Sequence, residues 1–307
     1  MNEVIRTENL SKKYKDVLAV SSISLNVRQG EIYGFLGLNG AGKTTTIRML
    51  LGMINPSQGQ AFIKGQKVHP NNSELWKNIG YLVEIPYAYP DLSVRENLEI
   101  FSKLRLINDK KAVDSIMEML KLSQYADRKV KHLSLGNAQR LGLAKALIHN
   151  PEILILDEPT NGLDPAGIFE IRQLLSDLAH NHGVTVFISS HILGEISRFA
   201  SRIGIIHNGV LIQEINTVEL ELLCQKKLKI NTLNNELAIS VLKNNDIFAI
   251  TTEDGTLEVS SEKYIKNPEL IASLLVNNQV PPNQLVAMEE DLESYFLRTI
   301  SEKGNIK

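Results

Sequence analysis

Eight residues from Gly37 to Thr44 have the types and spacing of a phosphate-binding loop, G-x-x-x-x-G-K-[ST]. Its glycines let successive backbone N–H groups point inward, and a following helix adds a partial positive charge at its N-terminus. In such a loop Lys43 places a charge on the terminal phosphates, and the Thr44 hydroxyl binds Mg²⁺. The loop lies between an apolar strand predicted at Ile32–Leu36 and a helix predicted at Lys43–Leu51. The sequence therefore predicts a nucleoside triphosphate site.

A second predicted strand ends in two acids. Ile153–Leu156 is apolar throughout and is followed by Asp157 and Glu158. We expect this strand to be buried beside Ile32–Leu36, with both acids at its carboxyl end, where open α/β sheets bind ligands. Asp157 is suited to hold the magnesium shell, and Glu158 to accept a proton from an attacking water. An apolar run ending in Asp-Glu can also be an ordinary strand end, but beside a phosphate loop it predicts hydrolysis.

Four further segments have a possible role at such a site. Leu133-Ser134-Leu135-Gly136-Asn137 precedes a helix expected from about Asn137 to Ile148, so Ser134 and Gly136 would present hydrogen-bond donors and a helix dipole. The others are Asn161-Gly162-Leu163-Asp164, Ser189-Ser190-His191 and Tyr14. Taken singly, these could be a capped helix, a loop, a surface histidine and a core tyrosine.

In order, from about Ile5 to Val218, these segments resemble the ATP-binding subunit of an ABC transporter. The resemblance implies that the Ser134 segment contacts the γ-phosphate held by a partner subunit and that the Asp164 loop links two ATP sites. It also implies that His191 reaches the γ-phosphate and that Tyr14 stacks on adenine. ATP and Mg²⁺ are the expected cofactors, and hydrolysis of ATP is the expected activity.

The expected site has three groups of residues. The catalytic residues are Glu158, His191 and Lys43. The nucleotide contacts are Tyr14, Gly37, Leu38, Asn39, Gly40, Ala41, Gly42, Lys43, Thr44, Thr45, Ser134, Gly136, Asn137 and Asp164. The magnesium ligands are Thr44, Glu84 and Asp157.

Two features depart from the family pattern. Glu84 stands where most relatives carry glutamine, and it resembles an acidic variant found in exporters that protect against lantibiotics and bacitracin-like peptides. It would add a third carboxylate near Asp157 and Glu158; a neutral local substitution is the alternative. In the Ser134 segment, Leu135 and Asn137 replace a glycine and a glutamine. Subgroup variation explains this, with weaker dimer closure as the alternative.

The surrounding elements predict two domains. Residues 1–218 alternate short apolar strands and helices, the rhythm of an α/β P-loop NTPase of ABC ATPase type: a mixed sheet core with a helical subdomain at about 86–150. Asn208-Gly209 predicts a hairpin turn. Residues 219–307 predict the order βαββαβ with a closing helix, a small α+β ferredoxin-like domain. Its Leu292, Phe296 and Leu297 resemble the closing helix of the peptide-antibiotic group.

Composition narrows the function classes. The 307 residues carry 33 Lys and Arg against 35 Asp and Glu, so no basic excess favours nucleic acid. The N-terminal residues lack the apolar stretch of a signal peptide, and no segment has the uninterrupted apolar length of a membrane span. Any membrane role is therefore expected to come through a partner.

The prediction is a head-to-tail homodimer that binds integral membrane permease subunits at the cytoplasmic face and powers export of lantibiotic or bacitracin-type peptides. One alternative is a soluble ABC ATPase in translation or on DNA. The short spacing from Lys43 to Ser134 leaves no room for a long coiled coil, and only one cassette is present. A second alternative, a small-molecule kinase, would leave the Ser134 segment, the Asp164 loop and His191 unexplained.

Overall fold

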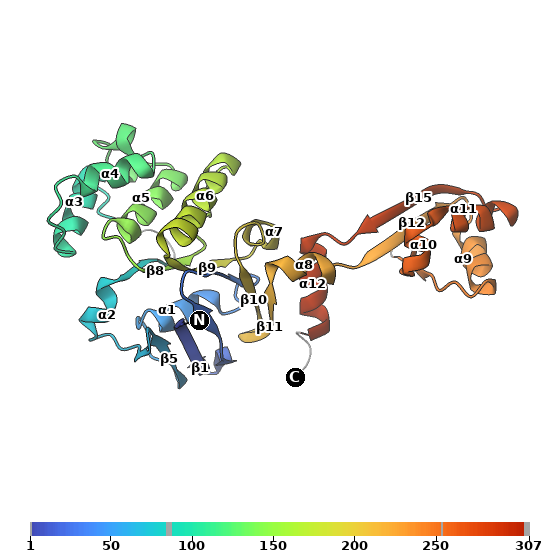
Figure 1. The fold of residues 1–307 in the computed structure, drawn as a ribbon, viewed down its shortest axis with the longest axis horizontal. Helices are drawn as coiled ribbons and strands as arrows, with labels where there is room; N and C mark the ends of the chain where they lie inside the picture. The colour runs from blue at the N-terminus through green and yellow to red at the C-terminus, as the bar shows by residue number, and fades with distance from the viewer. Residues whose placement is uncertain (1, 84–87, 253, 304–307) are drawn as a thin grey trace. The chain divides into compact units, whose positions relative to one another are not determined.

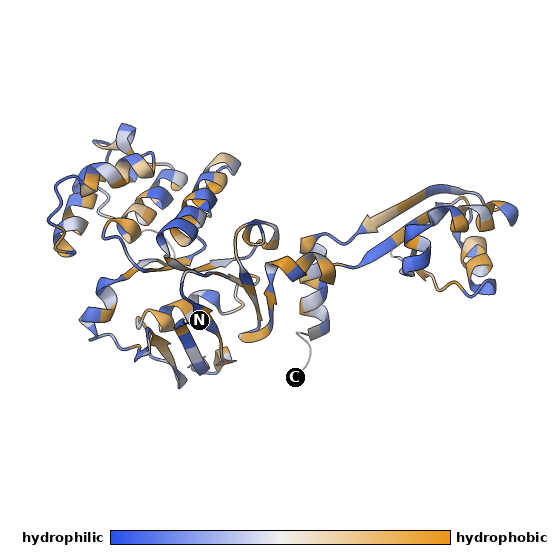
Figure 2. Cartoon of the chain, in the orientation of Figure 1, coloured by the Kyte–Doolittle hydropathy of each residue, from blue (hydrophilic) through white to orange (hydrophobic). Residues whose placement is uncertain are grey.

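The computed structural model describes residues 2–83, 88–252 and 254–303 (Figure 1). The chain divides into two compact units, with the boundary between Val218 and Glu219. Helices in both units carry hydrophobic and hydrophilic residues side by side (Figure 2), as expected for helices with one buried face. Within the described part of the chain, no helix has the length and apolar character needed to cross a bilayer.

The first unit is built around a six-stranded sheet in the order β11-β10-β4-β9-β8-β7. Its strands are β4 (Ile32–Leu36), β7 (Ile79–Leu82), β8 (Ile153–Asp157), β9 (Thr185–Ser190), β10 (Arg202–His207) and β11 (Val210–Asn216). All neighbours are parallel except β10 and β11, which form an antiparallel hairpin. The predicted Asn208-Gly209 turn is confirmed, and both residues have positive φ angles.

The strand that ends in the two acids is not beside the strand before the phosphate loop, so that prediction is wrong. β9 lies between β4 and β8 and pairs in parallel with both. All three strands are buried along their whole length, and burial alone does not reveal their order. The consequence is that residues of β9 stand between the two predicted halves of the site.

A second, antiparallel sheet packs near the first in the order β2-β1-β5-β6, with β3 also paired to β1. Its strands are β1 (Glu3–Tyr14), β2 (Val17–Ile23), β3 (Asn26–Arg28), β5 (Gln58–Ile63) and β6 (Gln66–Lys67). One hydrophobic core joins both sheets to the helix that follows the phosphate loop, with Leu10, Phe35, Ile47, Ile155 and Phe187 among its members. This core holds the helix firmly against β8 and β9.

The helices of the first unit lie between its strands in the sequence. They are α1 (Lys43–Leu50), α2 (Ser73–Lys77), α3 (Val94–Leu104), α4 (Ala112–Met119), α5 (Leu135–Leu147), α6 (Pro165–His182) and α7 (Leu193–Ile196). The next helix, α8 (Thr217–Leu223), contains the boundary between the two units. The helices α3, α4 and α5 follow one another without a strand between them, and they contact one another between β7 and β8. Arg140 of α5 ties this group to α6, because it donates to the Leu120 carbonyl and pairs with Glu170 at 2.9 Å.

The second unit is an antiparallel sheet in the order β13-β14-β12-β15 with its own core. Its elements are β12 (Lys226–Thr232), α9 (Asn235–Asn244), β13 (Ile250–Thr251), β14 (Leu257–Val259), α10 (Glu262–Lys266), α11 (Pro268–Asn277), β15 (Pro282–Glu289) and α12 (Leu292–Lys303). Two helices stand where the sequence predicted one, because Pro268 disfavours helical geometry at the preceding Asn267. The ferredoxin-like architecture stays a prediction.

Candidate functional site

The phosphate loop runs from the end of β4 into α1, as the sequence predicted. Leu38, Asn39 and Gly40 are exposed. Gly42 has φ 107°, and a Cβ atom built there would lie 2.7 Å from the carbonyl oxygen of Ala19. A side chain at this position would therefore meet both backbone strain and a rigid neighbour. This explains why the second glycine of the loop is needed.

Lys43 is buried at the start of α1, with 5% of its surface exposed. Its Nζ donates to the carbonyl oxygens of Gly37 at 2.7 Å and Leu38 at 3.3 Å. The same ammonium lies 3.1 Å from Glu158 Oε1. The predicted phosphate-binding cation thus already contacts the predicted general base.

Asp157 is also buried and accepts two hydrogen bonds. Thr44 Oγ1 donates to its Oδ2 at 2.7 Å, and Ser189 Oγ donates to its Oδ1 at 2.6 Å. Side chains two apart on a strand share a face, so Asp157 lies on the same face of β8 as Ile153 and Ile155. Those two residues belong to the core around α1, which is why Asp157 reaches Thr44 across the intervening β9.

Glu158 has a left-handed backbone, with φ 48°. For a residue with a side chain this costs about 1–2 kcal/mol, and such strain persists only where neighbours hold it. Its N–H donates to Ser189 Oγ at 3.0 Å, and its carbonyl accepts from Gln139 Nε2 and from the Asn161 N–H, each at 3.1 Å. Both backbone polar groups of Glu158 are therefore held by side chains from other elements.

His191 follows β9 and also joins the cluster. Its Nδ1 lies 2.8 Å from Glu158 Oε2, and about a third of its side chain is exposed. The Glu158 carboxylate therefore has Lys43 on one oxygen and His191 on the other. The structure brings together Lys43, Thr44, Asp157, Glu158 and His191.

The sequence reasoning assigned no role to two residues of this cluster, Ser189 and Gln139. Ser189 was present in the Ser189-Ser190-His191 segment, and its strand position next to β8 would have indicated a contact with Asp157. Gln139 is a buried amide on α5, whose other buried residues are apolar apart from Lys145. A polar residue on a buried helix face is a signal for a hydrogen-bonded role.

The Ser134 segment starts α5 two residues earlier than predicted, at Leu135. The reason is that Ser134 is the N-cap, and its Oγ accepts from the Asn137 N–H at 3.3 Å. Gly136 lies against Leu163 and the Gly162 carbonyl, so this segment contacts the Asp164 loop of the same chain.

Asp164 caps α6, because its Oδ1 accepts from the Gly167 N–H at 2.9 Å. Within the described residues, no hydrogen bond joins Ser134, Gly136, Asn137 or Asp164 to Gly37–Thr44. The structure therefore does not bring these four residues to the chain's own phosphate loop.

Four other predicted site residues have different outcomes. Tyr14 ends β1 with 42% of its surface exposed, and Lys12 Nζ lies 5.1 Å from its ring centre, so it is not a core tyrosine. Thr45 is half-buried in α1, and Ala41 is buried in the loop. Glu84 lies outside the described residues.

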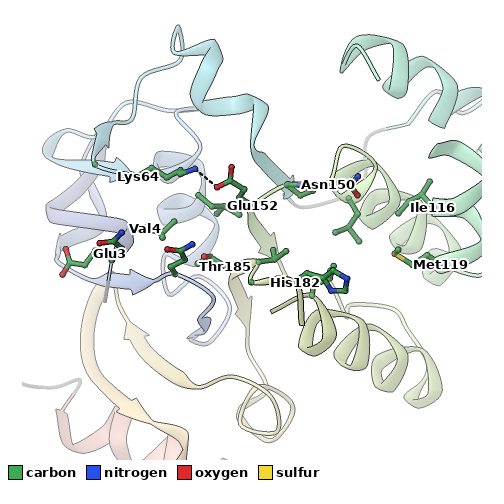
Figure 3. Close-up of a pocket in the computed structure, with 18 residues that line it drawn as sticks. Glu3, Val4, Lys64, Ile116, Met119, Asn150, Glu152, His182 and Thr185 are labelled. Carbon is green, nitrogen blue, oxygen red and sulfur yellow. Dashed lines mark hydrogen bonds and ion pairs between the residues drawn. The ribbon is translucent and has the colours of Figure 1, made fainter. Parts of the chain in front are cut away.

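A cavity of about 810 Å³ lies at the amino ends of the strands, away from the end at which the phosphate loop follows β4 (Figure 3). Ile153 and Thr185, the first residues of β8 and β9, contribute to its lining, so it is at the amino ends of the strands. Asp157 and His191 lie at or beyond the carboxyl ends. At its rim Lys64 pairs with Glu152 at 2.5 Å. This cavity is therefore separate from the phosphate loop.

Comparison with known proteins identifies the cassette. A family model described as ABC transporter matches residues 20–161. The bacitracin transport ATP-binding protein BcrA of Bacillus licheniformis is 42% identical over 302 residues, which cover 98% of each chain. The lantibiotic transport ATP-binding protein SrtF of Streptococcus pyogenes is 36% identical over 211 residues, covering 69% of this chain and 90% of that protein.

Solved structures agree on the fold. A dimeric ATP-binding cassette in a post-hydrolysis state, bound to ADP and phosphate, matches with a TM-score of 0.65 and 28% identity. The match covers 69% of this chain and 98% of that one. The α/β P-loop fold predicted for the first domain is thereby confirmed.

Proposed function

This chain belongs to the ABC transporter family as an ATP-hydrolysing, ATP-binding subunit, and we propose that it powers the export of a peptide antibiotic of the bacitracin or lantibiotic type. The observation that carries the proposal is the similarity to the bacitracin transport protein, which extends over 98% of both chains. It therefore includes the second unit, Glu219–Glu302, as well as the cassette. A role in translation or on DNA has no support from these relatives.

In the proposed mechanism, the backbone N–H groups of Gly37–Thr44 and the Lys43 ammonium bind the β- and γ-phosphates. Glu158 accepts the proton of the attacking water as general base. His191, hydrogen-bonded to Glu158 at 2.8 Å, orients that carboxylate and reaches the γ-phosphate. Tyr14, exposed at the end of β1, stacks on adenine. The contacts of Lys43 and His191 with the two oxygens of the Glu158 carboxylate support the assignment.

Magnesium fits the donor set at Thr44 and Asp157. Their two oxygens lie 2.7 Å apart, and hydroxyl and carboxylate oxygens are the ligands that this hard cation prefers. A bound Mg²⁺ would neutralise charge on the phosphate oxygens. Glu84 would supply a further carboxylate, and we predict that Glu84→Gln alters turnover, or its coupling to transport, more than ATP binding. Equal effects on all three would contradict a special role for Glu84.

We propose that the working form is a head-to-tail homodimer. Ser134, Gly136 and Asn137 make no hydrogen bond to the phosphate loop of their own chain, and their helix N-terminus presents donors to an anion. The segment from a second copy would complete each ATP site, and the Asp164 loop would link the two sites. The dimeric solved cassette supports this arrangement. Purified Glu158→Gln should dimerise with ATP and barely hydrolyse it.

The proposed place of action is the cytoplasmic face of the membrane, where integral permease subunits bind the dimer. The segment from Glu84 to Asp91 is proposed to contact them. Closure of the dimer on ATP would shift the permease to a new conformation, and hydrolysis would reset it.

Deleting the gene and measuring sensitivity to a panel of bacitracin-like and lantibiotic peptides tests the cargo. Sensitivity to at least one peptide should rise, and wild-type protein should restore resistance whereas Glu158→Gln should not. Unchanged sensitivity to every peptide would refute the export assignment and leave the ATPase assignment intact.

A further inference from the structure

Glu158 depends on two other elements for its backbone conformation. Its φ of 48° is unusual for a residue with a side chain, and its N–H donates to Ser189 of β9. Its carbonyl accepts from Gln139 of α5 and also from the N–H of Asn161 in the turn that follows. A change at the Ser189 or Gln139 bond would alter the direction in which the carboxylate leaves the strand.

Gln139 is well placed to hold this conformation. It is 3% exposed, and a buried amide is costly unless it is hydrogen-bonded. Its Nε2 spans from the middle of α5 to the carbonyl of Glu158. The same helix is capped by Ser134, five residues earlier and about 7.5 Å along the axis.

The Ser134 end of α5 and the carboxylate of Glu158, which Gln139 connects, serve different ATP sites in the proposed dimer. Ser134 would contact the nucleotide on the partner's phosphate loop, whereas Glu158 would act on the chain's own nucleotide. A helix transmits a displacement of its first turn to the residues one turn later, because its backbone is internally hydrogen-bonded.

We propose that Gln139 is a positioning residue that couples the Ser134 segment to the carboxylate of Glu158, so that ATP in one site sets the base of the other. The inference rests on the proposed dimer and on the role of Glu158 as base. Gln139 itself touches neither water nor phosphate in this mechanism. It holds the Glu158 carbonyl, and through it the direction of the reacting carboxylate.

The test uses the full-length protein and steady-state hydrolysis over a range of ATP concentrations. Gln139→Met removes the donor at similar length, and Gln139→Glu keeps the length but only accepts hydrogen bonds when ionised. Both should lower kcat about tenfold, the effect of one lost buried hydrogen bond, with KM changed by less than about twofold. The Hill coefficient for ATP should fall towards 1.

Arg140→Met is the matched control. It removes partly buried polar contacts of the neighbouring residue on α5, to the Leu120 carbonyl and to Glu170. In the portion of the chain that the structure describes, no hydrogen bond or ion pair joins Arg140 to Glu158. Its melting temperature should fall at least as far as that of Gln139→Met, while its Hill coefficient stays at the wild-type value. If Arg140→Met and Gln139→Met lowered the Hill coefficient equally, the proposed coupling between the Ser134 segment and Glu158 would be overturned.

A double variant separates this inference from the assignment of the base. Gln139→Met added to Glu158→Gln should lower turnover no further, because both changes act through one carboxylate. A further tenfold loss, or wild-type kcat in both Gln139 variants, would overturn the inference. The base assignment fails on a different result, full turnover by Glu158→Gln alone.

Discussion

Lys43 Nζ lies 3.1 Å from Glu158 Oε1, and both side chains are largely shielded from water. The pair joins the phosphate loop to the strand that carries the acids. ATP phosphates and Glu158 must therefore share one ammonium, so the same carboxylate that is proposed to activate water also competes with the nucleotide for Lys43. This relationship leads to the first prediction.

Glu158→Gln should separate binding from hydrolysis. The amide cannot accept the proton of the attacking water, so kcat should fall at least about 10²-fold. Because the competing charge on Lys43 is gone, ATP should bind more tightly than to the wild type. Phosphate release and nucleotide binding by fluorescence measure the two effects. Full turnover, or weaker ATP binding, would contradict this account of the pair.

Thr44→Val should weaken the response to magnesium. It removes the hydroxyl that donates to Asp157 at 2.7 Å while keeping the shape of the side chain. The Mg²⁺ concentration for half-maximal hydrolysis should rise at least about tenfold, because one ligand is lost. Thr46→Val is the control, since the Thr46 hydroxyl donates to the carbonyl of Gly42, the N-cap residue of α1. Equal shifts in both variants would argue against Thr44 as a ligand.

Gly42→Ala should damage the phosphate loop more than Gly40→Ala. Both residues have positive φ angles, so each alanine costs about 1 kcal/mol of backbone strain. Only at Gly42 does the new Cβ collide with a backbone atom, the Ala19 oxygen, whereas nothing lies within 4 Å at Gly40. ATP affinity, measured by calorimetry, should fall about tenfold further for Gly42→Ala. Equal losses would mean that strain alone governs the loop.

Ser189→Ala should lower both stability and turnover. Its hydroxyl donates to the buried Asp157 carboxylate and accepts from the Glu158 N–H. Losing a hydrogen bond to a buried charge should reduce the free energy of unfolding by about 2 kcal/mol. Urea denaturation checks this value. Ser190→Ala, whose hydroxyl accepts from the Ile192 N–H, should cost about 1 kcal/mol and serves as the comparison.

His149→Phe should reduce the loss of stability in mild acid. Burial is the main cause that lowers the pKa of His149 to about 4; the charge of Arg105 adds to it, and a hydrogen bond to Ile79 opposes it. Between pH 6.5 and 4 the unfolded chain therefore binds a proton that the folded chain excludes, so the free energy of unfolding falls as pH falls.

Denaturation midpoints at pH 7.5 and 5 measure this effect. The wild type should lose more free energy of unfolding between the two values than His149→Phe does. His132→Gln, at an exposed position, should behave as the wild type. A pH dependence that is unchanged in His149→Phe would show that this histidine does not titrate below its ordinary range in the folded protein.

Local segments of the sequence predicted most of the site. Gly37–Thr44 and the strands at β4 and β8 were correctly placed, because glycines, a short apolar run and a following helix act over neighbouring residues. The hairpin at Asn208-Gly209 was also predicted, because asparagine and glycine readily adopt the positive φ angles that a two-residue hairpin turn requires. Where residues distant in the chain had to be ordered, as for β9 between β4 and β8, the prediction was wrong.

The sequence by itself determined the phosphate loop and the acidic strand end, because each is a contiguous run whose residue types carry its chemistry. It also determined the family resemblance, which depends only on the order of such runs along the chain. Only the tertiary structure decided that Thr44 reaches Asp157, that Lys43 and His191 share one carboxylate, and that Gln139 and Ser189 hold the Glu158 backbone. The physical reason is that these contacts join elements far apart in the chain. Their geometry depends on sheet order and on packing around α1, which no single segment specifies.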